Sequence, residues 1–277
     1  GCSSNQYPLP DQDLTVDDFI NDAVAATEFL ASRPQIRNVV VIGHSQAGQY
    51  IPILLDRMPE IAVSGVLLAA PYQPIDKILK DQLAFSIETL LALGFNQSEA
   101  EAQVEPVVEL VEGVQAIRNG TNSDEAVGGT GVGFWKSWFD VVPHSLSAAA
   151  IVEQPMLVLN GLMDSNVPVE EAEAWAAHLT SVDANFELQL LPCVSHAMNC
   201  LNATNLVNLT AGDVGLHVDP IVVETLADFV RETTREKMSF SASPTESPSA
   251  SSKIATIGNP LAWAVVAMAV SELLNYL

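Results

Sequence analysis

The segment that most limits how this chain can fold is residues 38–50, NVVVIGHSQAGQY. Its four consecutive apolar residues, 39–42, have strong β propensity, and such an uninterrupted run is typical of a strand buried on both faces. The run ends at a glycine, and a serine follows two residues later among further small residues. We therefore expect a buried strand, a sharp turn that carries Ser45, and a helix from Gln46 to Met58.

The turn around Ser45 has the composition that a nucleophilic serine requires. A sharp strand-to-helix turn lifts the hydroxyl clear of the sheet, but it crowds the backbone. Residues two positions before and after the serine must then be small, and here they are Gly43 and Ala47, with Gly48 following. This is the G-x-S-x-G nucleophile elbow with alanine in the last position, and the alternative is a serine in an ordinary β–α turn. His44 adjoins the serine, and we expect it to line the pocket or to pack.

A nucleophilic serine also needs a base, an acid that orients the base, and an N–H donor for the oxyanion. The backbone N–H of Gln46, at the start of the expected helix, is one candidate donor. Behind a nucleophile elbow the triad follows the order serine, acid, histidine, and the acid and histidine lie in loops after later strands. Asp164 follows the expected strand 155–160, and His196 follows the expected strand 185–191.

Asp164 also has a simpler interpretation, because it could merely cap the helix that follows it. Of the five histidines, only His196 has the expected order and placement. Structural roles are favoured for the histidines elsewhere in the chain, which are His144, His178 and His217. The enzyme interpretation requires all three triad members, because loss of any one lowers the rate by several orders of magnitude.

The rest of the chain alternates strands and helices, which predicts a parallel sheet with helices on both faces. Helical spacing of apolar residues predicts a helix over 15–30, and a second buried strand is expected over 64–70. Residues 72–147 interrupt this rhythm with long amphipathic helices at 76–93 and 98–117, which we expect to form a cap above the strand ends. The alternation then resumes with a strand at 155–160, a helix at 169–179, a strand at 185–191 and a helix at 219–236.

Charge and cysteine content exclude some classes of function. The chain has 34 acidic and 11 basic residues, a net charge of −23, and such a field repels the phosphates of DNA and RNA. An odd count of three cysteines does not make a disulfide framework. Cys193 and Cys200 bracket His196, and they could either form a bridge in an oxidising compartment or remain ordinary thiols. No Cys/His grouping has zinc spacing, so we expect no metal.

The C-terminal part of the chain differs in composition from the rest. Residues 237–260 are a Ser/Pro-rich linker, and residues 261–277 are a hydrophobic tail that is short for a membrane span and interrupted by Glu272. Small residues at 249–252, a spacer and this hydrophobic end match a GPI-attachment signal. We therefore expect a secreted or cell-surface protein that is membrane-anchored at the C-terminus, by a lipid or by a span. A plain amphipathic C-terminal helix is the alternative.

Candidate glycosylation sites are consistent with secretion. Four Asn-x-Ser/Thr triplets occur, although about two are expected by chance in a chain this rich in Ser and Thr. They begin at Asn96, Asn119, Asn202 and Asn208.

Three segments together, VVVIGHSQAG, NGLMDSNVP and SHAMN in this order, resemble the α/β-hydrolase superfamily. More closely, they are similar to its branch of bacterial esterases and S33-type serine peptidase-like proteins. The resemblance covers about residues 10–236, and it implies a parallel α/β-hydrolase sheet flanked by helices with a helical cap insert at about 72–147. It also implies that Ser45 is the nucleophile, Asp164 the acid and His196 the base.

The chain departs from this pattern in two ways. Ala47 stands where glycine is usual, and we expect only a modest effect because alanine is small. The superfamily has several strands before the helix at 15–30, and one of their loops, often His-Gly-rich, donates the second oxyanion N–H. We therefore expect residues 1–236 to be a partial, N-terminally truncated domain without these strands and this donor. Losing one donor lowers the rate roughly 10²–10³-fold, and losing the strands exposes a sheet edge.

Taken together, the motifs predict a serine hydrolase that cleaves carboxylic esters through an acyl-enzyme. A thioesterase or a serine peptidase would use the same triad, and a non-catalytic surface protein that keeps the fold is the alternative from another class. The expected partner is a small-molecule ester or acyl substrate rather than nucleic acid. No cofactor is expected, because the triad and the oxyanion hole need none.

Overall fold

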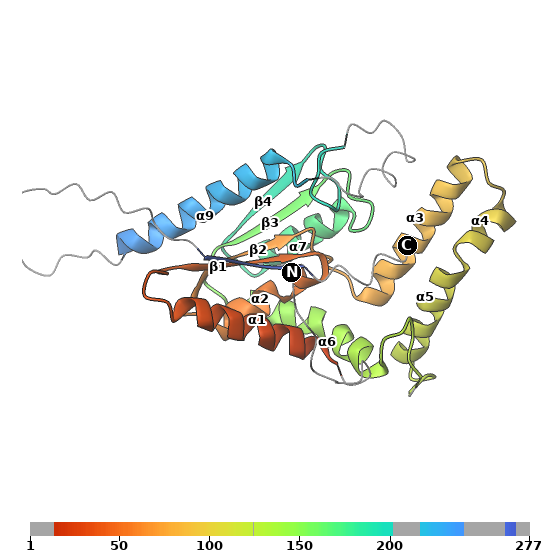
Figure 1. The fold of residues 1–277 in the computed structure, drawn as a ribbon, viewed down its shortest axis with the longest axis horizontal. Coiled ribbons are helices and arrows are strands. Elements are labelled where there is room, and N and C mark those ends of the chain that lie inside the picture. Colours follow the sequence, from red (N-terminus) through yellow and green to blue (C-terminus); the bar gives the residue numbers. More distant parts are fainter. Residues whose placement is uncertain (1–13, 124, 202–216, 241–263, 270–277) are drawn as a thin grey trace, which may run out of the picture.

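The computed structural model describes residues 14–123, 125–201, 217–240 and 264–269, and its centre is a parallel sheet between two layers of helices (Figure 1). The strand order is β4-β3-β2-β1-β5, and every neighbouring pair is parallel. The strands are β1 Val39–His44, β2 Ala62–Leu68, β3 Met156–Gly161, β4 Phe186–Leu191 and β5 Ala264–Ala269. The predicted α/β class with a parallel sheet flanked by helices is confirmed.

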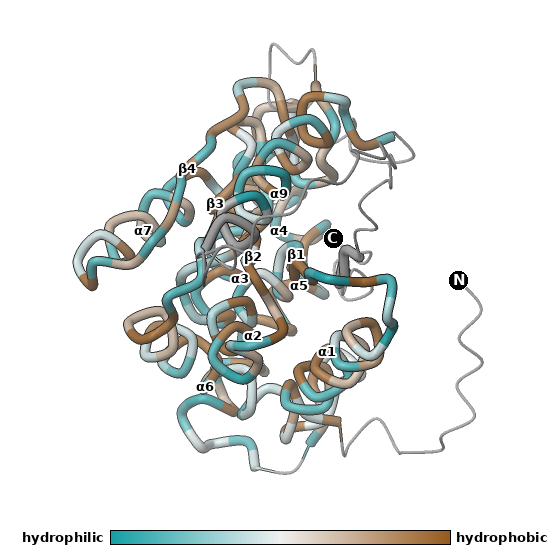
Figure 2. The backbone as a smooth tube through the Cα atoms, turned by 90° about the vertical axis from the view of Figure 1, so that its left-hand side faces the viewer, coloured by the Kyte–Doolittle hydropathy of each residue, from teal (hydrophilic) through white to brown (hydrophobic). Residues whose placement is uncertain are grey.

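Helices cover both faces of this sheet. One face carries α1 (Val16–Ala31), α2 (Ile51–Arg57), α6 (Val132–Ala149) and α7 (Val169–Ser181), and the other carries α9 (Pro220–Phe240). Side chains along each strand point alternately to the two layers, so Val41 packs with the first group of helices and Val40 packs with α9. Burial on both faces explains why the strands are continuous apolar runs. In Figure 2 the tubes of β1 and β2 are largely brown, whereas α1 and α2 mix brown with teal.

The insert expected at 72–147 separates into two parts. Helices α3 (Ile75–Ala92), α4 (Gln97–Gln103) and α5 (Glu105–Arg118) pack on one another and extend away from the sheet (Figure 1). Helix α6 packs mainly on α2, beside the sheet, and also contacts α1 and α5.

Two helices of this insert differ from the sequence expectation. The single helix expected over 98–117 is broken at Val104, because Pro106 fits the first turn of a helix but not its interior. Helix α6 was not specifically expected, since Pro143 lies inside it and a glycine-rich stretch precedes it. Its tryptophans, Trp135 and Trp138, are buried, and this apolar packing outweighs the unfavourable proline.

The C-terminal tail contributes the edge strand β5. Its residues pair in parallel with β1, with Val265 opposite Val40 and Ala267 opposite Ile42. This part of the tail is therefore a strand and not the amphipathic helix given as one alternative. Within the described residues, β5 is the strand that pairs with this edge of β1, and an apolar segment with valines suits the N–H and C=O groups that the edge presents.

The other C-terminal predictions fall mostly outside the described residues. Within the linker assigned to 237–260, only residues 237–240 are described, and they end α9. The candidate attachment residues 249–252 and the glycosylation sites Asn202 and Asn208 are not described. None of the helices in the described ranges is both long enough and apolar enough to cross a membrane.

Candidate active site

Ser45 lies at the junction between β1 and a short 3₁₀ helix, η1 (Ser45–Tyr50). Its φ is +56°, a region that is sparsely populated for residues other than glycine and that costs of order 1–3 kcal/mol. The α-helix expected from Gln46 is thus wrong in its first turns: η1 comes first, and α-helical geometry begins only at Ile51. The tighter 3₁₀ winding lets the chain reverse directly after the strand. A strained serine at a strand-to-helix turn is the geometry of a nucleophile elbow.

The elbow is closely packed on both sides of the serine. A Cβ atom built on Gly43 would lie 2.2 Å from the backbone oxygen of Ala47. A Cβ atom built on Gly48 would lie 2.4 Å from the Cβ of Ala70, which follows β2. Ala47 itself is fully buried. Close packing therefore leaves no room for a side chain at Gly43 or Gly48.

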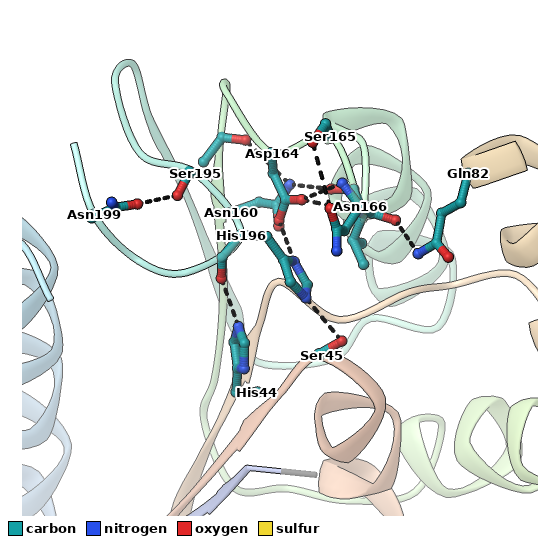
Figure 3. A network of polar contacts seen from close by, with 12 residues as sticks. His44, Ser45, Gln82, Asn160, Asp164, Ser165, Asn166, Ser195, His196 and Asn199 are labelled. Atoms are coloured by element: carbon teal, nitrogen blue, oxygen red, sulfur yellow. Dashed lines mark hydrogen bonds and ion pairs between the residues drawn. The ribbon is translucent and has the colours of Figure 1, made fainter. Parts of the chain in front are cut away.

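The structure brings Ser45, Asp164 and His196 together (Figure 3). Nε2 of His196 lies 3.1 Å from Oγ of Ser45, and Nδ1 of His196 lies 2.9 Å from Oδ2 of Asp164. Asp164 follows β3 and His196 follows β4, so all three residues lie at the carboxyl ends of parallel strands, where open α/β sheets bind ligands. Each of the three residues is at most 8% exposed.

Asp164 is held in a fixed orientation by its own loop. Its Oδ1 atom accepts the backbone N–H groups of Asn166 at 2.9 Å and of Val167 at 2.8 Å. Its Oδ2 atom faces Nδ1 of His196, which must therefore carry a hydrogen. Helix α7 begins at Val169 with Pro168 at its N-cap, so Asp164 does not cap that helix.

The loop that carries His196 is closed at its base. A disulfide joins Cys193 and Cys200, so the bridge is formed rather than the two free thiols of the other interpretation. Inside this loop, the hydroxyl of Ser195 donates to Oδ1 of Asn199, and the backbone N–H of Ser195 donates to the carbonyl of Asn199 at 2.9 Å. These bonds limit the positions that His196 can take relative to β4.

The backbone N–H of Gln46 lies in the first turn of η1, directly after Ser45. The first N–H groups of a helix have no acceptor inside it, so they are available to a negative charge at this end. Gln46 is buried, which strengthens such an interaction by lowering the local dielectric constant. Within the described part of the chain, we assign no second oxyanion donor.

The structure also shows polar contacts that sequence reasoning missed, between the cap and the loops of the site. Nε2 of Gln82 on α3 donates to the carbonyl of Asn166, next to the Asp164 loop, at 2.9 Å. The buried carboxylate of Glu171 on α7 accepts the backbone N–H groups of Tyr72 at 2.6 Å and of Gln73 at 2.8 Å, where the chain leaves β2 for the cap. For Gln82 and Glu171, the sequence signal is that each places a polar side chain on the buried face of an amphipathic helix.

Comparison with known proteins places these residues within one sequence family. Residues 14–199 match the family described as serine aminopeptidase, S33. Esterase EstD of Thermotoga maritima is 26% identical over 186 residues, which are 67% of this chain and 41% of that protein. The chain therefore spans about two fifths of the length of this curated relative.

Two solved esterase structures resemble the chain more distantly. Est1E from Butyrivibrio proteoclasticus is 16% identical with a TM-score of 0.46, covering 80% of this chain and 72% of that one. The Pyrococcus furiosus esterase Pf2001 is 17% identical with a TM-score of 0.42, covering 79% of this chain and 62% of that one. The assignment to a family rests on the match over residues 14–199 rather than on these two similarities.

Proposed function

Because the chain belongs to the serine aminopeptidase S33 family of α/β-hydrolases, we propose that it is a serine hydrolase that cleaves carboxylic esters through an acyl-enzyme. The observation that carries this proposal is the unbroken path of hydrogen bonds from Asp164 through His196 to Oγ of Ser45. The name of the relative from Thermotoga maritima, an esterase, supports esters as the substrate class.

In the proposed reaction, Oγ of Ser45 attacks the ester carbonyl carbon while Nε2 of His196 takes the hydroxyl proton. Asp164 stays ionised and stabilises the imidazolium that forms. The backbone N–H of Gln46 donates to the oxyanion of the tetrahedral intermediate, and such a donor contributes roughly 10²–10³-fold in rate. Collapse of the intermediate releases the alcohol, which takes the proton from His196. Water then attacks the acyl carbon while His196 takes its proton, and the second intermediate releases the carboxylic acid as His196 returns the proton to Oγ of Ser45.

A serine-directed fluorophosphonate probe tests this proposal. Wild-type protein should be labelled, and Ser45→Ala should not be labelled. Ser32→Ala is the matched control, because this serine lies on the exposed end of α1 and its loss should leave labelling unchanged. Equal labelling of wild type and Ser45→Ala, or no labelling of either, would contradict the proposal.

A serine peptidase is the second candidate, because the matching family is described as an aminopeptidase. The same triad serves esters, thioesters and peptides, since its chemistry is indifferent to the leaving group. Turnover of p-nitrophenyl esters, an acyl thioester and aminoacyl p-nitroanilides by one preparation separates these activities. We expect the highest kcat/KM for the esters, and a preference for the anilides would favour the peptidase. A non-catalytic surface protein would turn over none of them.

We also propose that the protein is secreted or displayed at the cell surface. The disulfide between Cys193 and Cys200 supports an oxidising compartment, and Asn96 and Asn119 are exposed, as glycan acceptors must be. Attachment through the tail requires residues 264–269 to leave their place beside β1. Treatment of intact cells with phosphatidylinositol-specific phospholipase C tests this attachment. Release of the protein by the enzyme indicates a lipid anchor. Retention of the protein in the membrane after both this enzyme and alkaline carbonate indicates a span. Recovery in the cytosol would contradict the proposal.

A further inference from the structure

Two consecutive residues, His44 at the end of β1 and Ser45 at the start of η1, contact the same histidine. The Nε2 atom of His44 lies 2.8 Å from the backbone oxygen of His196, and Oγ of Ser45 lies 3.1 Å from the ring Nε2 atom of His196. Figure 3 shows the two contacts at opposite ends of His196, one at its main chain and one at the tip of its ring. The junction between β1 and η1 therefore contacts both the backbone and the ring of this residue.

The hydrogen between His44 and His196 can be assigned from the chemistry of the two atoms. A carbonyl oxygen only accepts, so Nε2 of His44 must carry the hydrogen and donate it. The ring of His44 is uncharged near neutral pH, because burial and the adjacent His196 ring lower the pKa of His44 to about 4. An uncharged donor holds the loop without repelling the positive charge that would form on His196.

The two titratable groups that act on the charge of His44 come from two neighbouring loops. His196 lies in the loop after β4, with its ring centroid 4.8 Å from that of His44, and Asp164 lies in the loop after β3. Directly after β1, the neighbouring residue Ser45 carries a hydroxyl, which does not titrate in this range. The described backbone of β5 also adjoins His44, opposite Ala269.

We propose that His44 is a positioning residue for His196, whose main chain it fixes so that the imidazole stays aligned between Asp164 and Ser45. The inference rests on the proposed function, since it assigns a role in the same reaction. The disulfide closes the base of the loop at Cys193 and Cys200, whereas the bond from His44 acts on the carbonyl of His196 itself. The hydrogen bond of His44 goes to the main chain of His196 and not to its ring, so its contribution is to geometry and not to proton transfer.

Two substitutions at this position separate the hydrogen bond from the bulk of the ring. His44→Phe keeps an aromatic ring and removes the donor, whereas His44→Gln keeps an N–H group at a reach similar to that of Nε2. Displacement of a catalytic group by about 1 Å lowers the rate about 10²-fold. We expect His44→Phe to lower kcat and the rate of fluorophosphonate labelling about 10- to 100-fold, with KM within about twofold of wild type. His44→Gln should recover most of this loss.

Other outcomes would overturn the proposal. If His44→Phe keeps kcat within about twofold of wild type, the bond does not position the base. If both variants instead raise KM in a way that depends on acyl-chain length, His44 lines the substrate pocket. Thermal unfolding of both variants shows whether each is folded, and equal losses of kcat in two folded variants would also count against the hydrogen bond.

A readout without turnover keeps this inference separate from the proposed function. In proton NMR, the hydrogen on Nδ1 of His196, bonded to Asp164, should give a downfield resonance in wild type and in His44→Gln. This resonance should weaken or disappear in His44→Phe. If wild type neither hydrolyses esters nor reacts with the probe, the proposed function fails, and this resonance still tests His44. An unchanged resonance in His44→Phe would refute the positioning role.

Discussion

Asp164→Asn is the substitution whose outcome the geometry fixes most tightly. In the carboxylate, Oδ1 accepts the N–H groups of Asn166 and Val167 at 2.9 and 2.8 Å, and Oδ2 lies 2.9 Å from Nδ1 of His196. The asparagine must keep its oxygen on the two N–H donors, because turning its NH₂ group toward them would leave them unpaired, at about 1–3 kcal/mol each. Its NH₂ group therefore faces His196.

An NH₂ group at this position reverses the tautomer of His196. Nδ1 must then accept a hydrogen bond, so the imidazole proton moves to Nε2, which faces Oγ of Ser45. A protonated Nε2 cannot take the hydroxyl proton. In a Ser-His-Asp triad this change lowers kcat about 10⁴-fold, which corresponds to about 5 kcal/mol in activation free energy.

The assay for this prediction is steady-state hydrolysis of a short p-nitrophenyl ester at neutral pH. The matched control is Asp22→Asn, which makes the same chemical change on the exposed face of α1 and should leave kcat unchanged. KM and the thermal unfolding midpoint of Asp164→Asn should stay close to wild type, because the loop keeps its hydrogen bonds. If Asp164→Asn retains more than about a tenth of wild-type kcat, the tautomer argument is refuted.

Three further predictions concern the elbow, the disulfide and pH. Gly43→Ala should prevent a native elbow, because its Cβ would lie 2.2 Å from a backbone oxygen; a wild-type unfolding midpoint and kcat for this variant would contradict the packing argument. Reduction of the Cys193–Cys200 bond, or Cys193→Ser, should lower kcat because the loop that carries His196 loses its closure. If thiol titration confirms that the bond is reduced and kcat is unchanged, the disulfide does not have this role. Stability should fall as pH drops from 6.5 toward 4, because the pKa of His44 is about 4 when folded and 6.5 otherwise, so the unfolded chain binds the proton first. In urea unfolding, His44 should account for a loss of at most about 3 kcal/mol, and His44→Gln should lack this share of the loss.

The elbow and the order of the site residues could be predicted because both depend on local sequence. A run of apolar β-formers specifies a buried strand, and small residues around Ser45 specify a tight turn. The loops that hold Asp164 and His196 follow strands that the sequence also marks, and parallel strands bring their carboxyl ends to one edge. Local pattern and topology together were therefore enough to predict that these three residues lie close together.

Features that depend on distant parts of the chain could not be predicted in the same way. The bond from His44 to His196 joins residues 152 positions apart, and no local pattern reports it. The strand at 264–269 forms because the edge of β1 accepts it, whereas its composition alone equally fits a helix or a membrane segment. Helix α6 contains Pro143, and its packing on neighbouring helices, α2 above all, explains why it is helical.

The most direct test of the central claim is to identify the residue that becomes acylated. Wild-type protein is mixed with a p-nitrophenyl ester, quenched in acid during the first turnover, digested and examined by mass spectrometry. The acyl group should be found on Ser45, in the peptide that contains the elbow, and it should be absent from Ser45→Ala. Ester hydrolysis by wild type with the acyl group on another residue, or equal hydrolysis by Ser45→Ala, would contradict the account.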